Sequence, residues 1–281
     1  MSKEIKGKAI YSPKGKAGEY AKYACNFYVG CSNDCSYCYC KRGLLGHAMG
    51  APIATLKKCF KGEQDAIAEF CKELVSNLKE LQQHGLFFTF TSDPWLPETK
   101  ALTIEAVSFA ISWEIPCQIL TKRADFLQDI PESWLQHKPY IAFGFTITGH
   151  DELEPGASTN AERIEAMKKL HEMGFKTFAS IEPVISIEAS SRMIVETLGH
   201  CDLYKIGLLS GKREYSKTDV VKFTLDTAYV VSAHNLTYGA RTRIYFKDSI
   251  VEYGGYSRDE IRDASWMFKS IVVEADYNLF E

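Results

Sequence analysis

Short apolar runs alternate along this chain with longer segments whose apolar residues recur at helical spacing. The expected strands span residues 23–29, 86–90, 117–120, 140–147, 176–181 and 203–208. The expected helices span residues 63–83, 103–113 and 160–173. Parallel neighbours in a sheet need a crossover connection, which is usually a helix. The alternation therefore predicts an α/β fold with a parallel sheet built from six βα units.

The pattern continues without an internal repeat, a low-complexity segment or an interdomain linker. A chain of 281 residues is long enough for one or two domains. We expect one core over residues 23–210, with an N-terminal extension over 1–22 and a C-terminal extension over 211–281 packed on the core. The connection over residues 41–60 is long for a compact domain, and connections of this length usually have a function.

Composition narrows the class of protein. The chain has no long uncharged apolar run, so we expect no membrane partner, and its first residues lack the apolar core of a signal peptide. Nine cysteines, an odd number, do not form a secreted disulfide framework, so we expect a cytoplasmic protein. A net charge of −3 gives no overall attraction to nucleic acid, although a local basic surface remains compatible with it.

Three cysteines lie close together in the loop after the first expected strand. Cys31, Cys35 and Cys38 have the spacing Cys-x3-Cys-x2-Cys. Thiolates bind zinc or iron–sulfur clusters. A structural zinc site needs four ligands, so Cys25 or Cys40 would have to complete it. On a four-iron cluster, three ligands would leave one iron open for chemistry. Parallel barrels also place their active sites at the carboxyl ends of strands, where this loop lies.

With Tyr37 before the last cysteine, this motif resembles the signature of the radical S-adenosylmethionine (SAM) superfamily. Residues 27–39 are similar to the branch that contains spore photoproduct lyase. Further similarities to that branch lie in residues 91–95, 120–122, 153–157 and 182–184. The resemblance covers about residues 23–210 and implies a partial (βα)6 barrel of the TIM type as the core.

The resemblance also implies cofactors and a reaction. Cys31, Cys35 and Cys38 would be the metal ligands of a [4Fe–4S] cluster, and SAM would chelate the fourth iron. An electron from a reductant of the flavodoxin or ferredoxin type would cleave SAM to a 5′-deoxyadenosyl radical. Tyr37 would lie beside the adenine. The branch implies a lyase or repair reaction on a nucleic-acid base. The alternatives are radical modification of a peptide or small metabolite, and a non-enzymatic zinc or iron–sulfur binding protein.

Polar residues at the carboxyl ends of the expected strands are candidates for binding SAM. These candidates are Ser92, Asp93, Thr121, Lys122, Thr146 and Glu182. Most members of the family have a glycine-rich turn with a glutamate where this chain has Ser92-Asp93-Pro94, and the alternative is a plain turn. Lys122 would neutralise the SAM carboxylate and Glu182 would hold the ribose hydroxyls. The alternative for both is a solvated surface side chain.

Three residues are candidates for catalysis. Lys205 lies inside an apolar strand that we expect to be covered on both faces. Because burying an ammonium group is costly, its partner should be SAM carboxylate, a substrate phosphate or an internal glutamate, with Glu182 as the alternative ion-pair partner. Cys25 and Cys40 flank the cysteine motif. Either could donate a hydrogen atom, a role that a cysteine has in the photoproduct lyase branch.

Basic and aromatic residues alternate with apolar ones near the C-terminus. Arg241, Arg243, Tyr245 and Lys247 occupy every second position. This period predicts a strand with a basic face opposite an apolar one. The face would contact phosphates, or it would belong to an exposed strand whose charges discourage edge pairing.

Overall fold

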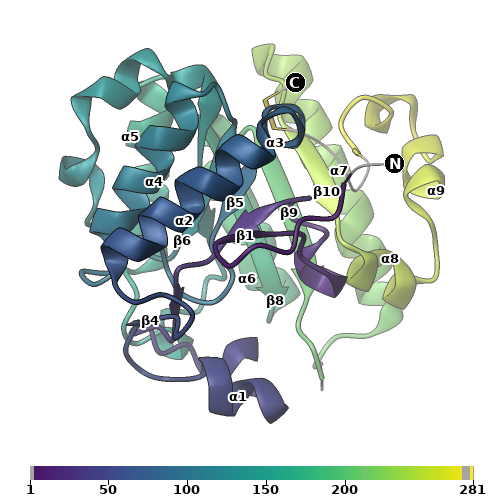
Figure 1. Ribbon diagram of the computed structural model, residues 1–281. Helices are drawn as coiled ribbons and strands as arrows, with labels where there is room; N and C mark the ends of the chain where they lie inside the picture. The colour runs from purple at the N-terminus through teal and green to yellow at the C-terminus, as the bar shows by residue number, and fades with distance from the viewer. Residues whose placement is uncertain (1–2, 212, 274–278, 281) are drawn as a thin grey trace. The chain divides into compact units, whose positions relative to one another are not determined.

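A computed structural model describes residues 3–211, 213–273 and 279–280 of the chain (Figure 1). The backbone separates into two compact units. The first runs to Phe143 and also includes Asp151–Thr159, and the second comprises Gly144–His150 and Asn160–Leu279. Each unit is described by itself below.

Eight strands form one sheet in the order β1-β2-β5-β6-β7-β8-β9-β10. Their bounds are β1 Ile10–Tyr11, β2 Ala24–Cys25, β5 Leu86–Phe88, β6 Cys117–Thr121, β7 Ile141–Thr146, β8 Lys176–Val184, β9 Leu203–Leu208 and β10 Arg243–Phe246. In the first unit, β1 is antiparallel to β2, while β2, β5 and β6 are parallel. In the second unit, β8, β9 and β10 are parallel. The predicted α/β class with a parallel sheet is therefore confirmed.

The first expected strand is divided in two. β2 joins the main sheet, whereas β3 (Tyr28–Val29) pairs antiparallel with β4 (Thr55–Leu56). Asn26 lies between them, and its side-chain oxygen accepts a hydrogen bond from the backbone nitrogen of Phe90 at 2.8 Å. The expected loop over residues 41–60 thus contains a strand and also the short helix α1 (Gly43–Met49).

The first expected helix is also divided, into α2 (Glu63–Ser76) and α3 (Leu78–His84). Asn77 interrupts it, because its side chain donates a hydrogen bond to the Glu73 carbonyl at 2.7 Å and competes with the backbone. Figure 1 shows α2 beside α4 (Lys100–Ser112), with which it is in contact.

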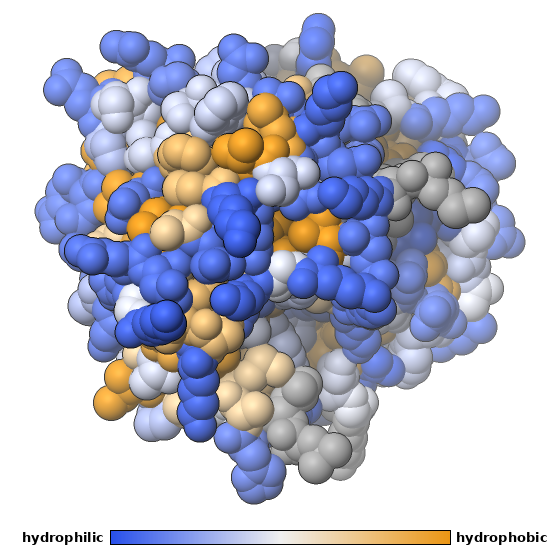
Figure 2. Space-filling view, in the orientation of Figure 1, coloured by the Kyte–Doolittle hydropathy of each residue, from blue (hydrophilic) through white to orange (hydrophobic). Residues whose placement is uncertain are grey.

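The helices of the second unit are α5 Asn160–Glu172, α6 Ile187–Thr197, α7 Lys217–Tyr238, α8 Asp248–Gly254 and α9 Arg258–Asp263. Short 3-10 turns lie at Gly15–Ala17, Tyr39–Lys41, Leu127–Asp129, Glu132–Gln136, Lys138–Tyr140, Asp151–Leu153, Leu198–His200 and Trp266–Phe268. No helix in the described ranges is both long enough and apolar enough to cross a membrane. Hydrophilic residues cover most of the face shown in Figure 2, and apolar residues form smaller groups between them.

The expectation of an exposed basic strand near the C-terminus is wrong. β10 extends the sheet as a parallel neighbour of β9, and only 2% of Tyr245 and 1% of Lys247 is exposed. Parallel strands inside an α/β sheet are covered on both faces, which is why these polar side chains are buried.

Candidate active site

The cysteine loop begins where β3 ends and lies against residues 50–53. Gly30 has φ +88°, and a Cβ there would be 2.4 Å from the Ile53 carbonyl oxygen. The next residue, Cys31, donates a backbone hydrogen bond to the Ala51 carbonyl at 3.0 Å. Glycine is therefore needed at the turn that places the first cysteine.

The three thiols of the loop have different environments. Burial raises the pKa of Cys31 to about 12, and Asp93 contributes in the same direction. A hydrogen bond from Cys40 lowers the pKa of Cys38 below its usual value, and the nearby Lys122 acts in the same direction. Cys35 is buried. These interactions favour the thiolate of Cys38, which is the form that binds metal.

The donor chemistry of the loop suits an iron–sulfur cluster. Cys31 and Cys38 are partly exposed while Cys35 is buried. Across the described ranges, no three His, Cys, Asp or Glu side chains converge on a site for one metal ion. In a four-iron cluster each thiolate binds its own iron, so these ligands need not converge on one point.

Asp93 connects the cysteine loop to the end of β6. Its Oδ2 accepts hydrogen bonds from Asn33 Nδ2 and from the Lys122 backbone nitrogen, both at 2.8 Å. Its Oδ1 accepts from Thr121 Oγ1 at 2.7 Å and from the Trp95 backbone nitrogen at 3.0 Å. The carboxylate is buried, and these four bonds to it hold the loop in place. Sequence reasoning missed Asn33, which lies between the cysteines without a recognisable signal.

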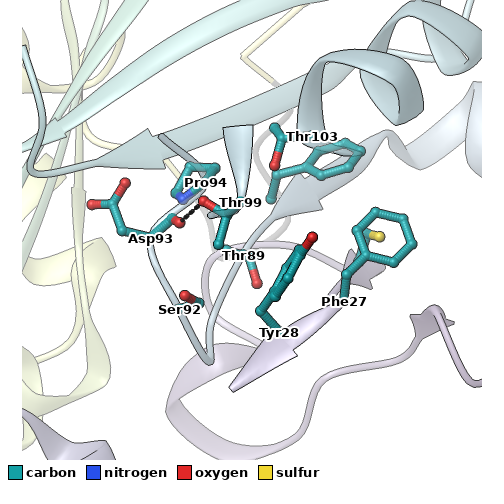
Figure 3. Close-up of a pocket in the computed structure, with 10 residues that line it drawn as sticks. Phe27, Tyr28, Thr89, Ser92, Asp93, Pro94, Thr99 and Thr103 are labelled. Carbon is teal, nitrogen blue, oxygen red and sulfur yellow. Dashed lines mark hydrogen bonds between the residues drawn. The ribbon is translucent and has the colours of Figure 1, made fainter. Parts of the chain in front are cut away.

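The turn that contains Asp93 borders a small cavity (Figure 3). Ser92 Oγ donates to the Gly30 carbonyl at 2.7 Å, and Thr99 Oγ1 donates to the Asp93 carbonyl at 2.7 Å. The cavity has a volume of about 10 Å³, enough for about one water molecule. Cys25 lines it and is completely buried, and burial raises its pKa well above the usual value.

Residues 153–157 pack directly on the cysteine loop. Ser36 N donates to the Leu153 carbonyl at 2.9 Å, and Gly156 N donates to the Asn33 carbonyl at 3.1 Å. A Cβ on Gly156 would be 2.0 Å from the Ser32 carbonyl oxygen. The absence of a side chain at this glycine therefore permits the close approach of the two backbones.

Tyr37 lies at the junction of these segments. Its hydroxyl donates to Glu154, whose side chain is buried. Lys122 Nζ is 5.5 Å from the centroid of the Tyr37 ring. Arg123 Nη1 donates to the Gly156 carbonyl at 2.8 Å. The first unit thus brings together the cysteine loop and residues 91–95, 120–122 and 153–157.

Cys40 lies next to the cysteine loop. It is buried, its thiol is 3.8 Å from the Phe90 carbonyl, and its hydrogen bond to Cys38 raises its own pKa. Cys25 and Cys40 remain predictions as hydrogen-atom donors.

The second unit contains the remaining candidates. Thr146 is buried at the end of β7, and its carbonyl accepts a hydrogen bond from Arg163 at 2.5 Å. Glu182 lies within β8, which continues two residues past it, and pairs with Lys247 Nζ at 2.9 and 3.0 Å. Burial and Lys247 lower the pKa of Lys205 to about 7, and Glu182 opposes this shift. Sequence reasoning placed Lys247 in a strand that would contact phosphates or be exposed, and it missed the pairing with Glu182.

Comparisons with known proteins point to one family. The model of the Radical SAM superfamily matches residues 25–200. An uncharacterised protein of Methanocaldococcus jannaschii is 28% identical over 188 residues, which are 65% of this chain and 67% of that protein.

Solved structures share the fold at low sequence identity. Spore photoproduct lyase complexed with dinucleoside spore photoproduct has a TM-score of 0.58 and 16% identity, and the match covers 84% of this chain and 80% of that one. A variant of that lyase with bound AdoMet and the same dinucleoside has a TM-score of 0.59, 15% identity, and coverage of 84% and 79%. SuiB of Streptococcus suis, bound to S-adenosylmethionine, has a TM-score of 0.51, 14% identity, and coverage of 79% and 46%.

Proposed function

Because the chain belongs to the radical SAM superfamily, whose cofactors are a [4Fe–4S] cluster and S-adenosylmethionine, we propose that Cys31, Cys35 and Cys38 hold the cluster. The observation that carries this assignment is the way the cysteine loop is fixed. Asp93 binds it from one segment, and Gly156 packs against it from another. A loop held by two other segments keeps its thiols in place before the cluster is assembled.

The residues around the loop have distinct tasks in this proposal. When bound, the reduced cluster supplies the electron that cleaves SAM. Lys122 carries a positive charge beside the Tyr37 ring and near the thiols of Cys31 and Cys38, where it suits the SAM carboxylate. The Tyr37 ring, held through its hydroxyl by Glu154, offers a flat surface for the adenine.

For the remaining candidates we keep the assigned roles as proposals. Ser92, Thr121 and Asp93 fix the backbone around SAM, and the first two act through their hydroxyl hydrogen bonds. Thr146, at the end of β7, and Glu182, within β8, keep the SAM-binding roles predicted for them. The electron would come from an external donor of the flavodoxin or ferredoxin type. A cytoplasmic location would provide the reducing surroundings that such a cluster needs.

We assign the substrate to nucleic acid, with a lyase or repair reaction on a base. The segment over residues 35–62 contains five Lys and Arg residues and neither Asp nor Glu. Arg42, Lys58 and Lys61 are exposed, as are Tyr39 and Ile53. The segment lies against the cysteine loop through the β3–β4 pair. A basic surface next to the cluster suits a phosphate backbone, and the exposed ring of Tyr39 suits an unstacked base.

The similarity in fold to a lyase complexed with a dinucleoside photoproduct supports the same assignment. The test has two steps. Anaerobic reconstitution with iron and sulfide, followed by dithionite and SAM, should give 5′-deoxyadenosine in the wild type and none in Cys35→Ala. The loaded enzyme should then convert dinucleoside spore photoproduct. The enzyme could form 5′-deoxyadenosine but neither convert the dinucleoside nor bind single-stranded DNA at low salt. That result would overturn the substrate assignment and leave the cluster assignment standing.

A further inference from the structure

The outer face of α7 (Lys217–Tyr238) is apolar over its second half. Leu225, Tyr229 and Leu236 are 38%, 60% and 63% exposed. Residues four and seven positions apart lie on one face of a helix, so these three form a single stripe, with Ala233 between Tyr229 and Leu236. The opposite face packs inside the second unit and carries the buried residues Val220, Phe223, Thr227 and Val231.

A tryptophan borders the stripe. Trp266 is 74% exposed and begins the 3-10 turn Trp266–Phe268. That turn contacts α7, where Ser232 Oγ donates a hydrogen bond to the Met267 carbonyl at 3.1 Å. Ser232 lies three residues after Tyr229 and four before Leu236, so it is their neighbour on the helix surface. We call Leu225, Tyr229, Ala233, Leu236 and Trp266 the α7 patch.

The helical part of the α7 patch lies in a stretch of chain without charge. Between Asp226 and Arg241 there is no Lys, Arg, Asp or Glu, although these residues make up 25% of the chain. A helix at the surface of a globular protein normally carries charged or polar residues on its outer face. The centre of a protein–protein interface is instead poor in charge and rich in aromatic residues. The α7 patch therefore has the composition of an interface.

The lack of charge also limits what can bind the patch. Nucleic acid is bound through Lys and Arg, and helices that lie on a membrane are rich in Lys and Arg on their polar face. The nearest basic residue on the same side of α7 is Lys222, whose Nζ is 2.6 Å from Asp226 Oδ2. The chemistry of the α7 patch therefore fits a protein surface that is itself apolar.

Two opposite charges mark the ends of the uncharged stretch. Asp226 is exposed on α7, and Arg241 is exposed shortly after Gly239, which ends the helix with φ +66°. In a second copy packed with its α7 antiparallel, Asp226 of each copy lies level with Arg241 of the other. A parallel arrangement would place like charges opposite each other. Ala233 lies halfway between the two charges, and its small side chain permits close approach of the helices.

We infer that two copies of this chain associate through the α7 patch, with their α7 helices antiparallel about a twofold axis near Ala233. Self-complementary contacts of this kind are the commonest between identical chains. At ~200 Å² for each large side chain, the exposed fractions of the patch amount to about 500 Å² per copy. Two copies would bury about 1,000 Å² in total, close to the lower limit of a specific interface. This association does not depend on the substrate.

Sedimentation velocity of the full chain under anaerobic conditions tests the association. An interface of this size suggests a dissociation constant on the order of 10 µM, so the range from about 1 µM to about 200 µM should show both species. The mass should rise from 31.7 kDa towards twice that value. Leu236→Arg places a charge in the contact and should raise the dissociation constant about a hundredfold. Val75→Arg, at a position on α2 that is 50% exposed, is the matched control and should change nothing.

The two end charges allow a test of the antiparallel arrangement. Asp226→Arg alone and Arg241→Asp alone should each raise the dissociation constant about tenfold, because both end contacts then join like charges. An equimolar mixture of the two variants should associate as the wild type does, since each contact again joins opposite charges. Circular dichroism checks that every variant is folded.

The remaining outcomes would overturn the inference. A mass of 31.7 kDa at every concentration would exclude the dimer. Flotation of that monomer with phosphatidylcholine vesicles would assign the α7 patch to a membrane surface instead. Unchanged association in Leu236→Arg would place the contact on another surface. Failure of the mixture to associate would exclude the antiparallel arrangement, and growth beyond a dimer would contradict the twofold axis.

Discussion

Replacing Lys205 with methionine should stabilise this protein. Methionine has nearly the same length and no charge, so it keeps the contact with Phe178 while removing the buried ammonium. Glu182 keeps its two hydrogen bonds from Lys247, so the substitution leaves that carboxylate paired. Replacing a buried charged side chain with an apolar one of similar volume is often neutral or stabilising, because the charge no longer has to be desolvated.

The size of the gain follows from the pKa of Lys205, which falls from 10.5 to about 7. A pKa difference of one corresponds to about 1.4 kcal/mol. Keeping Lys205 protonated in the folded protein therefore lowers the free energy of unfolding by about 5 kcal/mol at most. The substitution also removes the favourable contact between the ammonium and the Phe178 ring, which reduces the gain by about 1 kcal/mol. We therefore expect the free energy of unfolding to rise by about 2–4 kcal/mol at pH 6.5.

The sign of the pH dependence distinguishes this explanation from others. The folded protein binds fewer protons at Lys205 than the unfolded chain between pH 7 and pH 10.5, so this group makes the wild type more stable as the pH rises. The gain in Lys205→Met should therefore be largest below pH 7 and shrink towards pH 10. Urea unfolding under anaerobic conditions, followed by circular dichroism, measures both values. A loss of more than 1 kcal/mol at pH 6.5 would refute the reasoning, because it would mean that Lys205 holds the fold together.

Lys247→Met is the matched control. It removes the two hydrogen bonds that Lys247 donates to Glu182, whose side chain is 19% exposed. Breaking a buried pair on one side destabilises by about 3–5 kcal/mol. Two buried lysines should thus respond in opposite directions to the same substitution.

Three further substitutions probe the first unit. Asp93→Asn places an amide donor against groups that already donate hydrogen bonds. It should therefore lower the free energy of unfolding by about 3 kcal/mol and reduce the iron bound after reconstitution. Full iron content would contradict this. Gly156→Ala should also reduce bound iron, because its Cβ would be 2.0 Å from the Ser32 carbonyl, whereas Gly199→Ala, whose Cβ meets nothing within 4 Å, should not. Tyr37→Phe should raise the dissociation constant of SAM about tenfold while the iron content stays unchanged. Equilibrium dialysis measures this constant. Unaltered binding would show that the hydrogen bond to Glu154 does not orient the Tyr37 ring.

Local patterns in the sequence predicted the local structure well. The strand over residues 203–208 matches β9 at both ends, and the burial of Lys205 followed from the apolar residues around it. The cysteine motif predicted the radical SAM superfamily, whose model matches residues 25–200. These features depend on neighbouring residues, so a short stretch of sequence determines them.

Contacts between distant segments were harder to predict. The sequence indicated that Lys205 needs a partner, but it did not indicate that Glu182 binds Lys247, which is 65 residues away. Asp93 was predicted to bind SAM, but the four hydrogen bonds to its carboxylate, which join the cysteine loop to the end of β6, were not foreseen. Both arrangements depend on how strands are ordered in the sheet, which periodicity alone does not determine.

The position of β10 has a consequence for how this protein can be shortened. β10 covers one edge of β9, with Arg243 paired to Leu203 and Phe246 to Ile206. A fragment ending near residue 210, where the family resemblance stops, would leave the backbone groups of that edge without partners. Such an edge recruits strands from other molecules, so the fragment would aggregate even though it retained every cysteine of the motif.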